Sequence, residues 1–204
     1  MTGTAGHARR GLKVGLVIFS RYDSRRLPGK VLIPIAKVPL LGHVIERARR
    51  VPGGHPLIVA TSERPIDDPI AAYGQDRGVT VFRGDTENTL GRALNCARVH
   101  NLDAVARICG DSPFLQPDLF ATLIGWLDEK RLDIATNTFP RSFPPGISTE
   151  VVTTEALARA AQATTDANER EHCTLYFYRH PDDFSIANLA APDGRYDGIH
   201  LAVD

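Results

Sequence analysis

Hydrophobic residues alternate along this chain between two kinds of spacing. Nearly continuous apolar runs of strand length lie at residues 12–20, 56–61, 79–82, 104–109 and 132–136. Between them, apolar residues recur every three or four positions, which predicts helices at residues 38–49, 67–78, 86–100 and 116–130. Strands that alternate with helices in this way predict an α/β fold with a mostly parallel, covered sheet.

The helical segments also predict which side chains are buried and where the helices end. Helix 67–78 begins at Asp67 and Pro69, and Gly74 and Gly78 are expected at its exit. Thr86 is the expected N-cap of the next helix. The expected buried faces are Leu90, Ala93, Leu94 and Ala97 in that helix, and Leu119, Leu123, Trp126 and Leu127 in helix 116–130.

Beyond residue 137 the alternation becomes less regular. Residues 138–146 contain three prolines and a glycine, which predicts an irregular loop beside a site. Later strands are predicted at residues 148–153, 184–189 and 198–203, and helices at residues 154–163 and 170–179.

Composition and charge restrict the kind of protein this is. With 204 residues and 43% hydrophobic content, we expect a single domain over residues 12–204, preceded by a flexible tail at residues 1–11. Lysine plus arginine and aspartate plus glutamate each total 24, so no overall field favours nucleic acid or an anionic membrane. No apolar run approaches the ~20 residues of a membrane span. The three widely spaced cysteines favour a reducing cytoplasm over a disulfide framework.

A basic loop follows the first predicted strand. Residues 21–30 combine four cationic side chains with a serine and a glycine, so the loop can offer positive charge and backbone N–H groups to a polyphosphate. It lacks the spacing of a P-loop or of a dinucleotide-binding glycine motif. The alternative is an ordinary solvated surface loop. The residues concerned are Arg21, Ser24, Arg25, Arg26, Gly29 and Lys30.

Two carboxylates are candidate metal ligands. Asp111 directly follows the strand at residues 104–109, and Mg²⁺ prefers one or two carboxylates together with substrate phosphates. Asp204 follows the predicted strand at residues 198–203 and would bring a second carboxylate to the same edge. The alternatives are a turn-capping role for Asp111 and a frayed terminal position for Asp204.

Other polar residues carry weaker signals. His172 is a candidate base or metal ligand, although ordinary hydrogen bonding is the favoured interpretation. Asn137, Arg141 and Glu150 flank the proline-rich loop and are candidates for orienting a polar acceptor. No nucleophile and base occur at a usable spacing, and no aromatic platform for single-stranded nucleic acid is found.

Against this background the chain resembles the cytidylyltransferases that activate acidic sugars, especially the spore-coat polysaccharide branch related to the acylneuraminate enzymes. Its most specific block is Arg21-x-x-Ser24-x-Arg26-Leu-Pro-Gly-Lys30-Val-Leu. Residues 107–113, 170–174 and 203–204 also match, and the resemblance extends from about residue 12 to residue 204.

The resemblance implies a three-layer Rossmann-like nucleotidyltransferase fold and transfer of CMP from CTP to a small anionic acceptor, with Mg²⁺ and release of pyrophosphate. It also implies a homodimer with the acceptor side and dimer contact at about residues 137–195. By position, Arg21, Lys30 and Asp111 would be catalytic, and Asp111 and Asp204 would bind metal. Nucleotide binding is expected of Ser20, Arg21, Ser24, Arg26, Lys30, Ala60, Thr61, Arg83 and Asp111, and acceptor binding of Asn137, Arg141, Gly146, Glu150, Glu171 and His172.

Some positions depart from the family pattern and leave alternatives open. Asp23 stands where relatives carry a small residue, so we expect it to point away from a triphosphate or to pair with an arginine. Ser148 stands where many relatives have aspartate, which favours an unusual acceptor, such as a phosphonate. The alternatives are a nucleotidyltransferase that uses another nucleotide and a non-catalytic nucleotide-binding module with Asp204 as its last residue.

Overall fold

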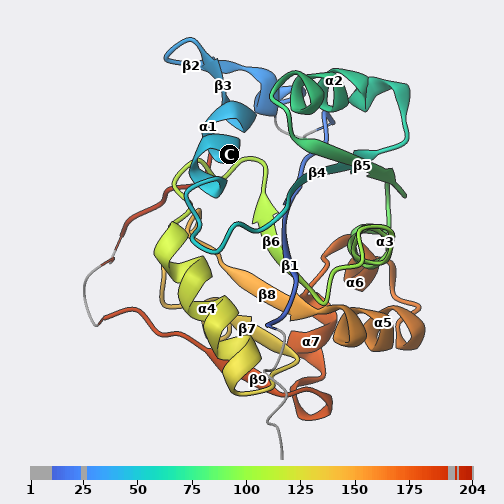
Figure 1. Cartoon of the computed structure of the whole chain (residues 1–204), viewed down its shortest axis with the longest axis vertical. Helices are drawn as coiled ribbons and strands as arrows, with labels where there is room; N and C mark the ends of the chain where they lie inside the picture. The colour runs from blue at the N-terminus through green and yellow to red at the C-terminus, as the bar shows by residue number, and fades with distance from the viewer. Residues whose placement is uncertain (1–10, 24–26, 193–195, 197, 204) are drawn as a thin grey trace, which may run out of the picture.

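A seven-stranded sheet forms the centre of the computed structural model, which describes residues 11–23, 27–192, 196 and 198–203 (Figure 1). The strand order is β5-β4-β1-β6-β8-β7-β9, and only β8 runs antiparallel to its neighbours. The predicted α/β class with a mostly parallel sheet is therefore confirmed. The strands are β1 (Val14–Phe19), β4 (Leu57–Ser62), β5 (Thr80–Gly84), β6 (Ala104–Cys109), β7 (Ile134–Thr136), β8 (Glu150–Thr153) and β9 (Ile186–Asn188).

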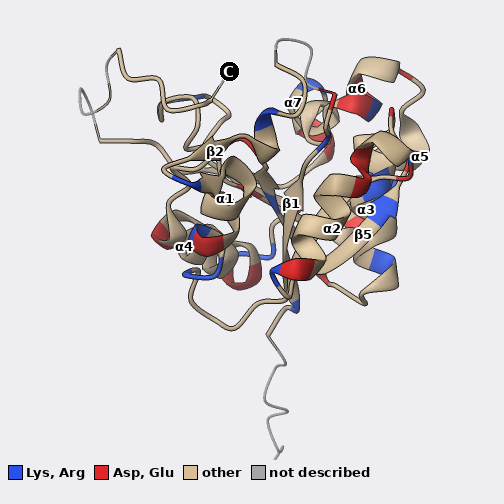
Figure 2. Ribbon diagram, turned by 90° about the horizontal axis from the view of Figure 1, so that it is seen from above, with Lys and Arg blue, Asp and Glu red and all other residues tan. Residues whose placement is uncertain are grey.

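Helices cover both faces of this sheet, so the fold has three layers. One apolar cluster joins a face of the sheet to α1 (Leu40–Ala48), α2 (Asp68–Asp76) and α4 (Pro117–Glu129). The other cluster joins the opposite face to α3 (Thr89–Val99), α5 (Thr154–Ala163) and α7 (Leu175–Arg179). Figure 2 shows α1 and α4 on one side of β1, with α3 and α5 on the other. None of the helices in the described ranges is long and apolar enough to cross a membrane.

Short elements complete the chain. The hairpin of β2 (Pro34–Ile35) and β3 (Val38–Pro39) lies between the 3-10 turn η1 (Lys30–Leu32) and α1. The turn η2 (Pro65–Asp67) leads into α2, α6 (Ala167–Glu171) precedes α7, and η3 (Pro181–Asp183) precedes β9.

Alternation along the strands explains how one sheet serves two cores. In β1, Leu16 and Ile18 enter the cluster beneath α1 and α4, whereas Val17 enters the cluster beneath α3 and α5. The same rule holds in β6, where Ala106 and Ile108 face one cluster and Val105 faces the other. Every odd-numbered residue of β6 therefore projects toward the α3 side, which decides where Arg107 and Cys109 point.

Several local predictions need correction. The buried stripe of α4 is Phe120, Leu123 and Leu127, and Leu119 and Trp126 are only partly buried. The N-cap of α3 is Asn88, whose side chain accepts a hydrogen bond from the Gly91 N–H, because residues 86 and 87 form a bend in which Asp85 accepts the Glu87 and Asn88 N–H groups. Gly74 lies buried inside α2, and the expected buried face of α3 is confirmed.

Two larger predicted elements differ from the structure. The helix expected at residues 170–179 is divided into α6 and α7, because His172 leaves helical dihedral angles and turns Cys173 into the core. Residues 198–203 do not form a strand. Instead, the Leu201 N–H donates to the Pro145 carbonyl, which links this segment to the proline-rich loop.

Candidate active site

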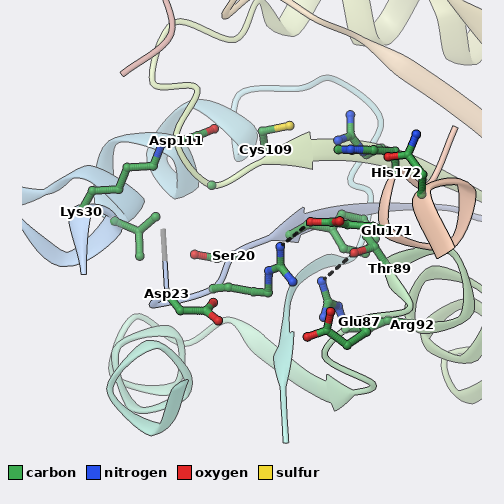
Figure 3. A pocket seen from close by; sticks show the side chains of 16 residues that line it. Ser20, Asp23, Lys30, Glu87, Thr89, Arg92, Cys109, Asp111, Glu171 and His172 are labelled. Atoms are coloured by element: carbon green, nitrogen blue, oxygen red, sulfur yellow. Dashed lines mark hydrogen bonds and ion pairs between the residues drawn. The ribbon is translucent and has the colours of Figure 1, made fainter. Parts of the chain in front are cut away.

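A cavity of about 720 Å³ opens at the carboxyl ends of β1 and β6. The chain passes from β1 to β4 and β5 on one side of the sheet before it returns to β6 on the other, so this cavity lies at the topological switch point. Figure 3 shows the side chains that line it. They are Phe19, Ser20, Arg21, Asp23, Lys30, Val31, Glu87, Thr89, Arg92, Arg107, Cys109, Gly110, Asp111, Asn168, Glu171 and His172.

Lys30 and Asp111 form an ion pair at one side of the cavity. The Lys30 Nζ lies 2.8 Å from the Asp111 Oδ2 and donates to the Val203 carbonyl at 2.9 Å. Lys30 opens η1 directly after Gly29, whose φ of 73° and close approach to the Tyr22 ring require a glycine. The Pro-Gly-Lys sequence thus turns the basic loop back toward the sheet and delivers an ammonium group to the carboxylate.

Arg92 is a buried cation with no ion-pair partner among the described residues. Its side chain is 1% exposed, and its guanidinium donates to the Asp85 carbonyl at 2.7 Å and to the Thr89 hydroxyl at 3.3 Å. Within the described residues it contacts no carboxylate, and its Nε has no hydrogen-bond partner. Burial, followed by repulsion from Arg21, lowers the pKa of Arg92 to about 10. An anion in the cavity would relieve this unfavourable charge.

Arg21 lies close to Arg92 and has a weak acidic partner. Its Nη1 donates to the Thr86 carbonyl at 3.0 Å, and its Nη2 lies 3.5 Å from the Glu171 Oε1. Both side chains of this pair are about one-third exposed, so the attraction between them is modest. Arg21 can therefore exchange Glu171 for a more highly charged ligand.

Arg107 enters the cavity from the middle of β6. It pairs in register with Glu150 of β8, and its Nη1 lies 2.5 Å from the Glu150 Oε2. Burial raises the pKa of Glu150, but the charge of Arg107 and hydrogen bonds from Tyr178 and Thr174 outweigh burial and hold that pKa below its usual value. Glu150 thus remains ionised and keeps Arg107 in place.

Two acidic residues, Asp67 and Asp23, fix the beginning of the basic loop. Asp67 is fully buried, accepts the Tyr22 N–H at 2.6 Å and also accepts the Ser62 hydroxyl. Asp23 pairs with Arg64 at 2.6 Å, as expected if its charge is to be tolerated beside an anion site. These contacts fasten the loop to the end of β4.

The structure brings six predicted site residues to this cavity, namely Ser20, Arg21, Lys30, Asp111, Glu171 and His172. Three others, Ser24, Arg26 and Asp204, lie outside the described residues. The remaining predicted residues do not line the cavity. Ala60 and Thr61 are buried in β4, and Arg83 binds Asp68 and the carbonyls of Ser62 and Arg64. Asn137 bonds with the backbone of Ile147 and Thr149, and Arg141 binds the Ser148 hydroxyl. Gly146 lies against residues 201 and 202, and Glu150 lies behind Arg107.

Sequence reasoning missed Arg92 and Arg107, although a signal was present for each. Arg92 follows Thr89 by three positions and precedes Cys96 by four, on the buried face of its helix. Arg107 interrupts the otherwise apolar run of β6. A cation at a position that periodicity assigns to the core is a candidate for ligand binding, because burying it without a partner is costly.

Comparisons with known proteins agree with this geometry. A family model described as cytidylyltransferase matches residues 16–201. The chain is 33% identical to the spore coat polysaccharide biosynthesis protein SpsF of Bacillus subtilis, over 87% of this chain and 75% of that protein. It is 30% identical to 3-deoxy-manno-octulosonate cytidylyltransferase of Anaeromyxobacter dehalogenans, over 89% of this chain and 69% of that protein.

Solved structures give the same picture. A cytidylyltransferase from Leptospira borgpetersenii superposes with a TM-score of 0.87 at 30% identity, over 95% of this chain and 82% of that one. A CMP:2-keto-3-deoxy-manno-octonic acid synthetase complexed with CTP superposes with a TM-score of 0.67 over 88% of this chain and 90% of that one. At 22% identity, the second likeness concerns the fold alone.

Proposed function

We propose that this chain, which belongs to the cytidylyltransferase family, transfers CMP from CTP to a small anionic acceptor. The acceptor that we favour is an acidic sugar. Membership makes the chain a nucleotidyltransferase. The choice of CTP, the release of pyrophosphate and the nature of the acceptor are our proposals. Similarity to the spore coat polysaccharide protein supports a product that is used in polysaccharide synthesis.

The observation that carries this proposal is the unbalanced buried charge of Arg92. The buried guanidinium of Arg92 contacts no carboxylate in the described part of the chain and lies close enough to Arg21 for the two to repel each other, and Lys30 lines the same cavity. A triphosphate would add negative charge beside Arg92 and Arg21. Its phosphate oxygens would replace the Glu171 contact of Arg21 and satisfy donors that the protein leaves free.

The chemistry follows from where these cations lie. A hydroxyl oxygen of the acceptor forms a bond to the α-phosphorus of CTP and loses its proton to water. The bond between the α-phosphorus and the departing pyrophosphate breaks in the same step. Charge builds on the pyrophosphate during this step, so Lys30 and Arg21 would act by stabilising it. A nucleophilic side chain is not needed because the acceptor itself attacks the phosphorus.

Mg²⁺ fits the site through Asp111. The Asp111 side chain is 30% exposed at the cavity, and one of its oxygens, Oδ2, pairs with Lys30. Within the described residues, no three potential ligands cluster, so phosphate oxygens of the substrate would complete the coordination. When bound, the ion would neutralise phosphate charge, and we expect Asp204 to join Asp111 as a ligand.

We further propose that the enzyme acts as a homodimer in the reducing cytoplasm. Its three cysteines carry free thiols, which supports that compartment. The segment after Asn137 is the expected dimer contact. Sedimentation that shows only a monomer at high micromolar concentration would refute the dimer.

Pyrophosphate release tests the proposed reaction. The purified chain with Mg²⁺ is supplied with CTP, UTP, GTP or ATP, each together with 3-deoxy-manno-octulosonate, N-acetylneuraminate or a small phosphonate. We expect release with CTP and at least one sugar acid, and none without an acceptor. Equal release with every nucleotide would contradict the choice of CTP, and release with the phosphonate alone would contradict the acidic sugar.

A further inference from the structure

Arg107 is a cation of the cavity wall that lies apart from Lys30. It lies within β6, whereas Asp111 lies in the turn that follows the end of that strand. Its strand neighbour on the side away from β1 is Glu150 of β8. The cation therefore lies on the β8 side of the cavity, beyond the Lys30–Asp111 pair.

The Arg107–Glu150 pair is held by a network of hydroxyl groups. Glu150 is 3% exposed, and its Oε1 accepts the Tyr178 hydroxyl at 2.6 Å. The Tyr178 hydroxyl lies 2.9 Å from the Thr136 hydroxyl and 3.0 Å from that of Thr138. Glu150 is thus saturated with partners on the side away from the cavity, which fixes the position and the charge of its carboxylate.

The guanidinium of Arg107 retains unused donors. Only its Nη1 is bonded to Glu150, and its buried Nε has no partner within the described part of the chain. The side chain is 22% exposed and lines the cavity. A guanidinium bonds a carboxylate through a planar fork of N–H groups, so one side of Arg107 is positioned by Glu150 while the rest can meet a ligand.

Stability alone does not account for this arrangement. A buried ion pair is often no more stabilising than apolar side chains of similar size, and valine or isoleucine would suit the middle of a buried strand. The pair instead preserves a fixed cation at a cavity wall. Placing Glu150 behind it, rather than in the cavity, leaves the positive charge facing the ligand.

We propose that Arg107 binds the carboxylate of the acceptor and that Glu150 is the residue that positions Arg107. This inference rests on the proposed cytidylyltransferase function and assigns the acceptor to the sugar acids. Glu150, expected on the acceptor side, then acts through Arg107 rather than by touching the acceptor. Cys109 and His172 line the same cavity, so they would lie beside the bound sugar.

The test compares acids with their neutral amides. The double variant Arg107→Gln/Glu150→Gln removes both charges together, because Arg107→Gln alone leaves Glu150 buried without a counter-charge. At saturating CTP, KM is measured for 3-deoxy-manno-octulosonate and N-acetylneuraminate and for the carboxamide of each. We expect KM for the acids to rise about 10- to 100-fold in the double variant, the range for losing a charged hydrogen bond, with little change for the amides.

Two further variants separate binding from structure. Arg107→Lys retains a charge for Glu150 but loses the fork, so KM for the acids should rise while kcat and the KM for CTP remain close to wild type. Arg159→Gln removes a more exposed ion pair with Asp133, 2.8 Å away and outside the cavity, and should leave both KM values unchanged.

The outcomes are distinguishable. The inference is overturned if the double variant loses acid and amide turnover equally, or if wild type binds CTP but prefers neither acid to its amide. If wild type binds no CTP, the proposed function fails, and this inference fails with it.

Discussion

The arginines of the cavity differ in what neutralises them. Arg107 has a buried carboxylate at 2.5 Å, and Arg21 has a carboxylate at 3.5 Å that is one-third exposed. Arg92 has none within the described residues and is almost fully buried. The side chain that is least favourable for stability is therefore the one best explained by ligand binding.

Replacing Arg92 should separate stability from function. In Arg92→Met, an unpaired buried charge becomes an apolar side chain of similar length, so the free energy of unfolding should rise by about 1 kcal/mol. CTP affinity should fall about 10- to 100-fold because a charged donor to the phosphates is lost. Urea unfolding and calorimetric titration measure the two effects.

A control on the same helix makes this prediction specific. Arg98 is exposed in the last turn of α3, and Arg98→Met should change neither stability nor CTP affinity appreciably. If Arg92→Met is destabilised and binds CTP as wild type does, Arg92 has a structural role and the argument from buried charge is wrong.

Lys30 should affect turnover more than nucleotide binding. We expect Lys30→Ala to lower kcat by about 10²- to 10³-fold, by analogy with the loss of one preorganised donor to developing charge. Lys13 provides a matched control, because it precedes β1 at the opposite end and donates to the His100 carbonyl. Turnover of Lys30→Ala within a few-fold of wild type would exclude the proposed role.

At the scale of elements, periodicity predicted what is governed by local pattern and burial. The strands β1, β4, β5, β6 and β7 and the helices α1 to α5 were predicted from apolar spacing and cap residues, whereas the short β2–β3 hairpin was not predicted. The strand predicted at residues 198–203 was wrong because a short apolar run does not reveal its bonding partners, and here the backbone N–H groups of Leu201 and Val203 donate to carbonyls of two loops.

The candidate site was predictable only in part for a related reason. Lys30 and Asp111 follow the two strands that meet at the switch point, so their meeting could be expected from order alone. The pairing of Arg107 with Glu150 depends on the antiparallel register of β8 against β6, which no local pattern reveals. The same holds for Asp23 and Arg64, where the need for a partner was predictable but its identity was not.

The proline-rich loop and residues 198–203 depend on a glycine at position 146. Gly146 has a φ of 96°, and an added Cβ would overlap the backbone of Leu201 and Ala202. Gly146→Ala should therefore lower the free energy of unfolding by more than the ~1–2 kcal/mol of backbone strain alone, and should reduce kcat by displacing the segment that bonds Lys30.

Gly54 offers the matched control for that substitution. It has a φ of 63° but open space around its Cβ position, so Gly54→Ala reports backbone strain without overlap. Chemical denaturation of both variants gives the comparison. Equal destabilisation, with normal activity in Gly146→Ala, would show that contact with residues 201 and 202 does not support the site.

At the scale of the whole molecule, a chain with zero net charge brings cations from distant parts of the sequence to one cavity, which carboxylates also line. The switch point of the sheet brings the ends of β1 and β6 together, α3 contributes Arg92, and β8 fixes Arg107 from behind. The account therefore requires a nucleotide site that is local, selective and strengthened by a divalent cation.

Calorimetric titration of the purified chain with CTP, UTP, GTP and ATP, each with and without Mg²⁺, tests that requirement without knowledge of the acceptor. The account predicts one site per chain that prefers CTP and binds it more tightly with Mg²⁺, through Asp111 and the phosphates. Binding of no nucleotide, or equal binding of all four with no effect of Mg²⁺, would contradict it.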